Sequence, residues 1–313
     1  MKLKTVPISQ RKTLVDVKNF AKLAQPSRAF NSFIDSFPDI LGGSDFKALV
    51  DAIVRAVKAR KTVGVGLGAH VIKCGLSPVI IDLMKRKVIT AIAMNGATAI
   101  HDYEISLVGR TSEDVAESIK TGKFGMVDET AQAFVRASKD AVLNDKGLGS
   151  SLGHLILKDR KRSADHPVRD KYSSSSILAQ AAKLGVPVTV HVALGTDTIH
   201  MHPAISGAEL GESSINDFRL FTKVICGLNK GVWLNIGSAV ILPEVFLKAV
   251  SVARNQGYKL DSFTTANLDM IQHYRPRQNV TGRPLSKTSL GINLTGQHEI
   301  LLPLLRMAVL GRL

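Results

Sequence analysis

The chain has few aromatic residues, few cysteines and no long apolar run. Aromatic side chains make up 5% of its 313 residues, so we expect a core built mainly from aliphatic side chains. Two cysteines, Cys74 and Cys226, are too few for a disulfide framework, which favours a reduced, cytoplasmic setting. No apolar run reaches the roughly 20 residues that span a bilayer, and the first residues lack a signal-peptide pattern. We therefore expect no membrane association.

Positive charge is in excess, with 41 Lys and Arg against 26 Asp and Glu and a net charge of +15 at pH 7. Two basic stretches, residues 1–30 and 158–171, carry much of it. Such charge attracts acidic proteins or nucleic acid over long range. No interleaved aromatic residues and no nucleic-acid motif accompany it. A solvated basic surface and a surface for an acidic macromolecular partner both remain open.

A repeated order of strand, loop and helix follows the mixed first forty residues. Continuous apolar runs of strand length are typical of strands buried on both faces, and helix-length segments come between them. The runs occupy residues 62–68, 88–94, 186–193, 231–236 and 261–268. We predict an α/β fold, a Rossmann-like parallel sheet with helices on both faces. A basic extension over 1–44 would precede one domain over 45–313.

Two predicted helices have clear start signals. Residues 45–60 place apolar side chains on one helical face, with Ser44 or Asp45 as the N-cap. The next begins with Ser77 as the cap and Pro78 in the first turn, where a missing N–H costs little. Residues 95–104 are interpreted as a loop, and a further helix is expected from residue 111.

Ligands of open parallel sheets bind beyond the carboxyl ends of the strands, so the loops there hold the candidate residues. The first runs from Gly64 to His70 with three closely spaced glycines, either a phosphate cradle or a tight turn. The next apolar run ends at Asn95, where a dinucleotide-binding fold usually has an acid. The loop from Asn235 to Ala239 offers backbone donors and a hydroxyl, and it would hold a phosphate or simply turn the chain.

Histidines and carboxylates mark the other two loops. His101 beside Asp102 suggests acid–base chemistry, or else a helix start with Asp102 as the cap. The alternation of His200 and His202 would put both on one strand face, a possible metal edge. Because these histidines and His191 lack a suitable fourth ligand, we expect pocket residues and no bound metal.

The chain as a whole resembles deoxyhypusine synthase, and more closely its shorter bacterial and archaeal relatives. The resemblance covers roughly residues 45–310 and is carried by residues 67–104, 186–203 and 235–255 in this order and spacing. It implies a Rossmann-like sheet and homotetramers with NAD at subunit interfaces. The implied reaction oxidises spermidine by hydride transfer to NAD. It then passes the aminobutyl group, through an imine on an enzyme lysine, to a lysine of an acidic translation factor.

The resemblance also implies site residues. Asp197 matches a carboxylate that binds the polyamine, and the alternative is a helix or turn cap. His200 in the same loop joins it as a substrate-binding candidate. The cofactor-binding candidates lie in three turns: Gly66, Gly68 and Ala69; Asn95, Gly96, Ala97 and Thr98; and Gly237 and Ser238. Lys287, which falls near the imine-forming lysine, and His101 are the catalytic candidates.

This sequence departs from the family pattern in three places. Paired glutamates of the family are replaced by Ile100 and His101, and a histidine after the glycine turn by the segment starting at Val240. Lys287 fits the imine-forming position only with a small deletion, and the alternative is an ordinary exposed loop lysine. Three hypotheses follow: deoxyhypusine synthesis, the same fold and cofactor with another amine or acceptor, and a non-catalytic basic binding protein.

Overall fold

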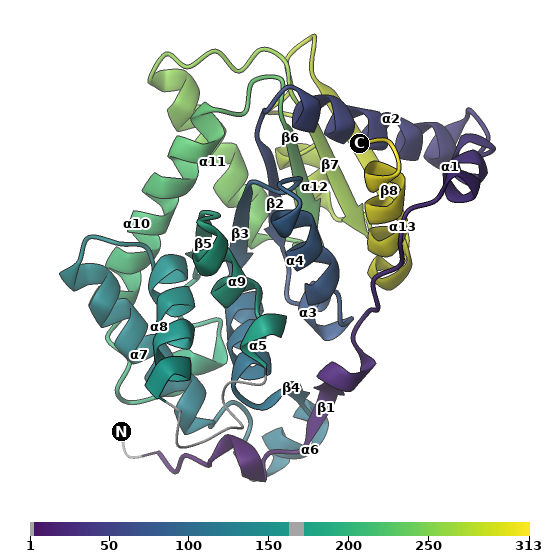
Figure 1. Ribbon diagram of the computed structural model, residues 1–313. Helices are drawn as coiled ribbons and strands as arrows, with labels where there is room; N and C mark the ends of the chain where they lie inside the picture. Colours follow the sequence, from purple (N-terminus) through teal and green to yellow (C-terminus); the bar gives the residue numbers. More distant parts are fainter. Residues whose placement is uncertain (1–2, 163–171) are drawn as a thin grey trace. The chain divides into compact units, whose positions relative to one another are not determined.

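The computed structural model describes residues 3–162 and 172–313, and it has a mixed α/β fold (Figure 1). The chain forms two compact units. Unit 1 comprises Met1–Phe20 and Met94–Leu220, and unit 2 comprises Ala21–Ala93 and Phe221–Leu313. The predicted N-terminal extension, residues 1–44, therefore contributes to both units. Of the basic stretch at 158–171, residues 163–171 lie outside the described part of the chain.

A six-stranded sheet has the strand order β5-β3-β2-β6-β7-β8. The pairs β2–β6, β6–β7 and β7–β8 are parallel, and helices flank the strands, as the apolar runs predicted. A separate antiparallel pair joins β1 and β4 in unit 1. The strands are β1 (Thr13–Asp16), β2 (Val63–Leu67), β3 (Ala91–Asn95), β4 (Arg110–Glu113), β5 (Val188–His191), β6 (Val232–Ile236), β7 (Thr264–Asp269) and β8 (Leu290–Thr295).

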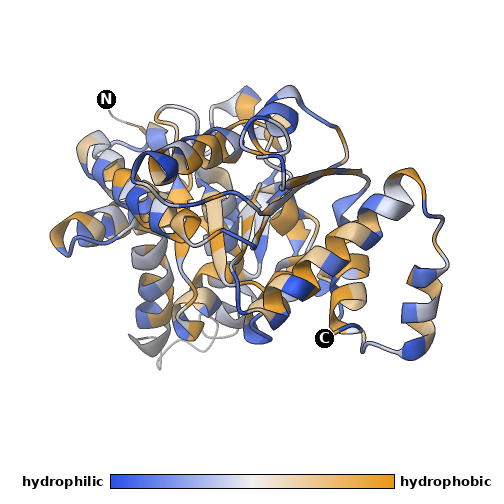
Figure 2. Ribbon diagram, turned by 90° about the horizontal axis from the view of Figure 1, so that it is seen from above, coloured by the Kyte–Doolittle hydropathy of each residue, from blue (hydrophilic) through white to orange (hydrophobic). Residues whose placement is uncertain are grey.

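The helices divide between the units. Those of unit 1 are α5 (Gly96–Val108), α6 (Val115–Ser118), α7 (Asp128–Leu143), α8 (Leu148–Arg162), α9 (Ile177–Leu184) and most of α10 (Gly207–Cys226), with the short 3-10 helix η5 (Thr198–Met201). Those of unit 2 are α1 (Arg28–Asp35), α2 (Leu41–Lys58), α3 (His70–Lys73), α4 (Ser77–Lys85), α11 (Ile241–Asn255), α12 (Tyr274–Asn279) and α13 (His298–Leu310). Many helical ribbons in Figure 2 carry both hydrophilic and hydrophobic colours, as helices with one buried side do.

The core of unit 2 explains two of the closely spaced glycines. Every residue of β2 and β6 is buried, and Trp233 of β6 stacks on Phe246 of α11 at a centroid distance of 5.3 Å. A Cβ on Gly64 or on Gly66 would lie 2.8 Å from the Trp233 ring. Both glycines therefore make room for the indole ring in the core.

Two predicted helix starts were wrong. Helix α2 begins at Leu41 with Ile40 as its N-cap, so Ser44 and Asp45 lie inside the helix. Helix α4 begins at Ser77 with Leu76 as its N-cap, although Pro78 does lie in the first turn. In neither helix does a side chain cap the first turn.

The interpretation of residues 95–104 as a loop was also wrong. Helix α5 begins directly at Gly96, because Asn95 caps it: its Oδ1 accepts hydrogen bonds from the Thr98 backbone N–H (2.9 Å) and hydroxyl (2.7 Å). The segment from residue 111 belongs to β4 before the short helix α6 begins. His101 and Asp102 are thus helical residues. None of the helices in the described part of the chain has the length and the hydropathy that a membrane-spanning segment requires.

Candidate functional site

The turns after β2 and β6 touch one another in unit 2, and the turn after β6 touches the carboxyl end of β7. The backbone N–H of Gly68 donates to Ile236 O (2.8 Å), and that of Gly237 donates to Leu268 O (3.1 Å). A Cβ on Gly68 would lie 1.9 Å from the carbonyl oxygen of Gly237, so position 68 requires glycine. Ala69 continues this turn toward α3.

The turn after β6 combines an unusual backbone with a helix start. Gly237 has a φ of +66°, a left-handed conformation that favours glycine. Ser238 is buried, and its Oγ accepts a hydrogen bond from Leu242 N in the first turn of α11 (3.3 Å). Of the predicted cofactor residues in unit 2, Gly68, Gly237 and Ser238 therefore come together, whereas Gly66 faces the core.

Polar side chains of β6 and β7 are hydrogen-bonded to one another next to this turn. Asn235 Nδ2 donates to Asn267 Oδ1 (2.7 Å) and to Ser238 O (2.9 Å). Asn267 Nδ2 donates in turn to Gln272 Oε1 (2.7 Å). Asn235 Oδ1 is buried and has no hydrogen-bond partner among the described residues. Sequence reasoning missed Asn267, whose only signal was a polar residue within an apolar run.

An acidic residue ends β7, the strand that follows α11. Asp269 is 6% exposed, and its Oδ1 accepts a hydrogen bond from Met270 N (2.8 Å). Beside it, His298 at the start of α13 is fully buried, with Nε2 3.0 Å from Leu268 O. The acid was expected from the sequence at residue 95, the end of β3, whereas it lies at the end of β7.

The second group of candidates lies in unit 1, around the start of α5. A Cβ on Gly96 would lie 2.0 Å from Asp197 Oδ2, so the carboxylate of Asp197 rests against the first residue of the helix. Burial raises the pKa of Asp197 from 3.8 to about 6. Asp197 is also the N-cap of η5 and forms a capping box with His200, as the capping alternative predicted. Among the described residues, no cationic side chain forms an ion pair with it. The predicted substrate-binding carboxylate thus lies beside the start of α5, which is formed by the cofactor-binding candidates Asn95, Gly96, Ala97 and Thr98.

His200 is held in one tautomer by its own loop. Its Nδ1 accepts hydrogen bonds from the backbone N–H groups of Gly195 (3.1 Å) and Asp197 (3.0 Å). An accepting Nδ1 leaves the proton on Nε2, which is buried and has no partner among the described residues. The ring therefore offers one unused N–H donor in the loop that carries Asp197.

The histidines of this loop do not share a strand face, contrary to the sequence interpretation. His200 lies in the 3-10 helix η5, and His202 follows it with Nε2 3.1 Å from Asp128 Oδ1. His191 is buried in β5, where its Nε2 lies 2.9 Å from Thr189 Oγ1, and burial lowers the pKa of His191 to about 3. Each ring has its own surroundings, which suit pocket or packing roles.

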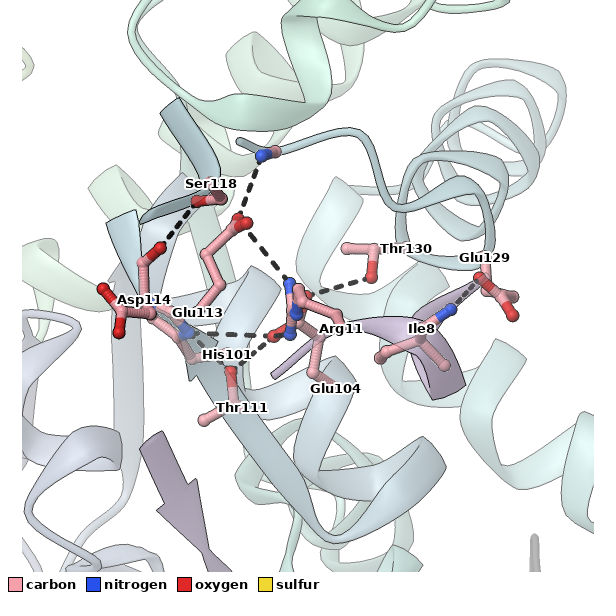
Figure 3. A network of polar contacts seen from close by, with 11 residues as sticks. Ile8, Arg11, His101, Glu104, Thr111, Glu113, Asp114, Ser118, Glu129 and Thr130 are labelled. Carbon is pink, nitrogen blue, oxygen red and sulfur yellow. Dashed lines mark hydrogen bonds and ion pairs between the residues drawn. The ribbon is translucent and has the colours of Figure 1, made fainter. Parts of the chain in front are cut away.

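His101, a predicted catalytic residue, is part of a polar network that holds the N-terminal segment (Figure 3). His101 Nδ1 lies 2.6 Å from Thr111 Oγ1, and the Thr111 hydroxyl donates to Glu104. Glu104 also binds both terminal nitrogens of Arg11 (2.8 and 2.6 Å), and Glu113 lies 3.9 Å from the same guanidinium. These contacts fix Arg11 against α5 and β4.

Asp102 has a capping role, but for a different helix from the one expected. It is fully buried in α5, and it accepts hydrogen bonds from Ile177 N (2.7 Å), Leu178 N (2.9 Å) and Ser176 Oγ (2.6 Å). These donors belong to the start of α9. Burial raises the pKa of Asp102 to about 6, although the three donors favour its charged form.

Lys287, the other predicted catalytic residue, is exposed in the turn before β8. The same turn is tied to Asp261, which precedes β7, through the hydroxyl of Thr288 and its neighbours. These residues lie at the amino-terminal ends of β7 and β8, whereas Gly68 and Gly237 lie at carboxyl ends. A six-residue strand spans about 20 Å, so the structure does not bring Lys287 to the glycine turns.

Comparisons with known proteins show the fold. No protein-family model matches the chain, and no curated protein matches it. A solved structure described as a "putative deoxyhypusine synthase" from Entamoeba histolytica is 13% identical, with a TM-score of 0.50 over 88% of this chain and 91% of that one. Unliganded AgrE (TM-score 0.52, 14% identity) and its ternary complex with ornithine and NAD+ (0.50, 15%) are also similar.

The two AgrE matches include 91% and 92% of this chain, which spans only 34% of the length of each AgrE chain. At such low identity the likeness establishes a shared architecture only. The chain thus shares its fold with these structures, among them the one described as a deoxyhypusine synthase, as the resemblance implied.

Proposed function

We propose that this protein is an NAD-dependent enzyme that oxidises an amine. The reaction moves a hydride from the carbon next to the amine nitrogen to NAD+, and the nitrogen loses a proton, which leaves an imine, NADH and H+. Such chemistry requires a fixed anion for the ammonium group and a nucleotide site beside parallel strands.

The observation that carries the proposal is the partly buried carboxylate of Asp197, which forms no ion pair with a cationic side chain of the described residues. Its pKa is raised to about 6 by burial, so at pH 7 it is charged in surroundings that disfavour the charge. A bound cation such as an ammonium group would remove this cost. The unused Nε2–H of His200 would add a donor for a polar group of the same substrate.

Residues of unit 2 support the cofactor part of the proposal. The order β6, glycine turn, α11, β7 and then Asp269 matches the dinucleotide-binding arrangement, in which an acid at the end of the second strand binds ribose hydroxyls. The turn from Gly237 to Val240 precedes a 15-residue helix, whose amino end favours a pyrophosphate. Asn235 Oδ1, buried without a partner, would accept a hydrogen bond from the same ligand. When bound, NAD+ would supply the hydride acceptor.

Deoxyhypusine synthesis is the most specific version of the proposal. It requires spermidine as the amine, a lysine that carries the aminobutyl group and a lysine of an acidic translation factor as its acceptor. The similarity to AgrE with ornithine and NAD+ supports the wider version, an NAD enzyme for some other amine. The exposed position of Lys287, at the far ends of the strands, also favours the wider version.

Calorimetry of the two ligands tests the two halves separately. We expect Asp197→Asn to weaken putrescine or spermidine binding at least tenfold, about 1.4 kcal/mol, while NAD affinity stays unchanged. Asp269→Asn should weaken NAD by a similar factor, because a carboxylate accepts from two ribose hydroxyls and an amide from one. The exposed acid Glu117 provides a matched control, since Glu117→Gln should alter neither affinity.

Unchanged amine binding in a folded Asp197→Asn protein would show that Asp197 has only a structural role, and it would refute the substrate part of the proposal. No NAD binding to the unaltered protein at millimolar concentration would refute the cofactor part.

A further inference from the structure

Three side chains of unit 2 bring different metal-ligating atoms together. They are His70 at the start of α3, Cys74 just after its end and Glu299 in the first turn of α13. One ligand atom from each residue lies within 4.8 Å of the other two. An imidazole, a thiol and a carboxylate at such separations can all reach one ion of the size of zinc with small side-chain movements.

The fold fixes this cluster at the carboxyl ends of β2 and β8. The short helix α3 follows the Gly68 turn, and Cys74 N donates to His70 O (2.8 Å), which puts the two side chains one helical turn apart. Helix α13 begins three residues after β8 ends, and Glu299 is its second residue. Two ligands thus come from one turn of helix and the third from a helix start.

The donor set favours a borderline-soft divalent cation. A thiolate and a carboxylate balance the two positive charges of the metal, and a neutral imidazole adds no further charge. Calcium and magnesium prefer oxygen ligands, so a thiolate disfavours them. Three protein ligands also leave a fourth tetrahedral position for water or substrate, as in catalytic zinc sites.

A buried histidine beside the cluster provides a second observation. The ring of His298 is fully buried, and its centroid lies 5.5 Å from that of His70. Its Nε2 lies 3.0 Å from Leu268 O, which leaves Nδ1 buried without a hydrogen-bond partner among the described residues. A buried polar atom without a partner requires an explanation, and an ion or a water beside it provides one.

We propose that His70, Cys74 and Glu299 bind one divalent transition metal, preferably zinc, through Nδ1 or Nε2, Sγ and a carboxylate oxygen. This site could not be expected from the sequence, because Glu299 is far from the other two ligands along the chain. The proposal does not depend on the amine or on NAD. It concerns residues other than the histidines considered from the sequence.

Cobalt titration of the chelator-treated protein tests the proposal. We expect one Co2+ per chain, with a thiolate-to-cobalt charge-transfer band in the near ultraviolet, and loss of that band when Zn2+ is added. Cys74→Ser should abolish the band, and His70→Ala and Glu299→Gln should each weaken Co2+ binding at least tenfold. Cys226→Ser is the matched control, because it removes the other cysteine and should leave the band intact.

No charge-transfer band in the unaltered protein, or a band that persists in Cys74→Ser and disappears in Cys226→Ser, would overturn the proposal. Circular dichroism of each variant distinguishes a lost ligand from a lost fold. Calorimetry with NAD on the metal-free protein keeps this test separate from that of the proposed function. Absence of metal binding would not refute NAD binding, and absence of NAD binding would not refute the metal site.

Discussion

Two aspartates in unit 1, the fully buried Asp102 and the partly buried Asp197, share a raised pKa but should respond in opposite ways to the same substitution. Burial raises the pKa of Asp197 and that of Asp102 to about 6. Asp102 accepts three hydrogen bonds at the start of α9, whereas Asp197 has no cationic partner among the described residues. We predict that Asp197→Asn stabilises the folded protein at pH 7 and that Asp102→Asn destabilises it.

The size and sign of the effect at Asp197 follow from its pKa. Because the folded carboxyl binds its proton more tightly than the unfolded one, its charge destabilises the fold once the pH exceeds about 6. The difference between 3.8 and about 6 corresponds to about 3 kcal/mol at pH 7. Solvent screening of the partly exposed side chain reduces the expected gain to about 1–2 kcal/mol. The gain should shrink between pH 6 and pH 4 and be absent below 3.8.

Asp102→Asn replaces one accepting oxygen by an NH2 group that faces donors of α9. A buried donor left without an acceptor costs about 1–3 kcal/mol, so we expect a loss of at least about 1 kcal/mol. Urea unfolding of both variants at pH 7 and pH 4 measures these differences. Destabilisation of the protein by Asp197→Asn at pH 7 would refute the view that no cation offsets the cost of burying this carboxylate.

Three further substitutions test the packing and the assembly. Gly68→Ala should destabilise the protein by several kcal/mol and weaken NAD binding at least tenfold, because the new Cβ would lie 1.9 Å from Gly237 O. Gly211→Ala, which places its Cβ in open space on α10, is the control. It should raise the free energy of unfolding in urea by about 0.5–1 kcal/mol. Arg11→Ala should cost about 3–5 kcal/mol, since it leaves Glu104 charged and buried. We expect light scattering to give the mass of a homotetramer. Leu41, at the start of α2, is 83% exposed, and we predict that it lies at a subunit interface. Leu41→Asp should then lower the mass that light scattering measures.

The sequence predicted the central strands well, because burial on both faces leaves continuous apolar runs. It missed β8, whose exposed and buried residues alternate at the edge of the sheet. It also missed α5, because polar residues such as Asp102 and Glu104 are buried there through bonds to other segments. Such tertiary bonds leave no periodic signal in the sequence.

The candidate site was predictable only in part. The loop with Asp197 and the turn at Gly237 stood out because polar and glycine residues follow apolar runs. The acid at Asp269 and the cluster around His70 depend on which strands are neighbours, and the sequence order does not reveal this. Gly66 was assigned to the cofactor because a glycine that makes room for Trp233 cannot be distinguished in the sequence from one that contacts a ligand.

The most direct test of the central claim is NADH formation by the purified protein with NAD+ and an amine. We predict that spermidine, putrescine or agmatine yields NADH by fluorescence, and that Asp197→Asn lowers the rate at least tenfold while Glu117→Gln leaves it unchanged. No NADH above background with any of the three amines, in protein that binds NAD, would contradict the assignment of this chain as an amine-oxidising enzyme.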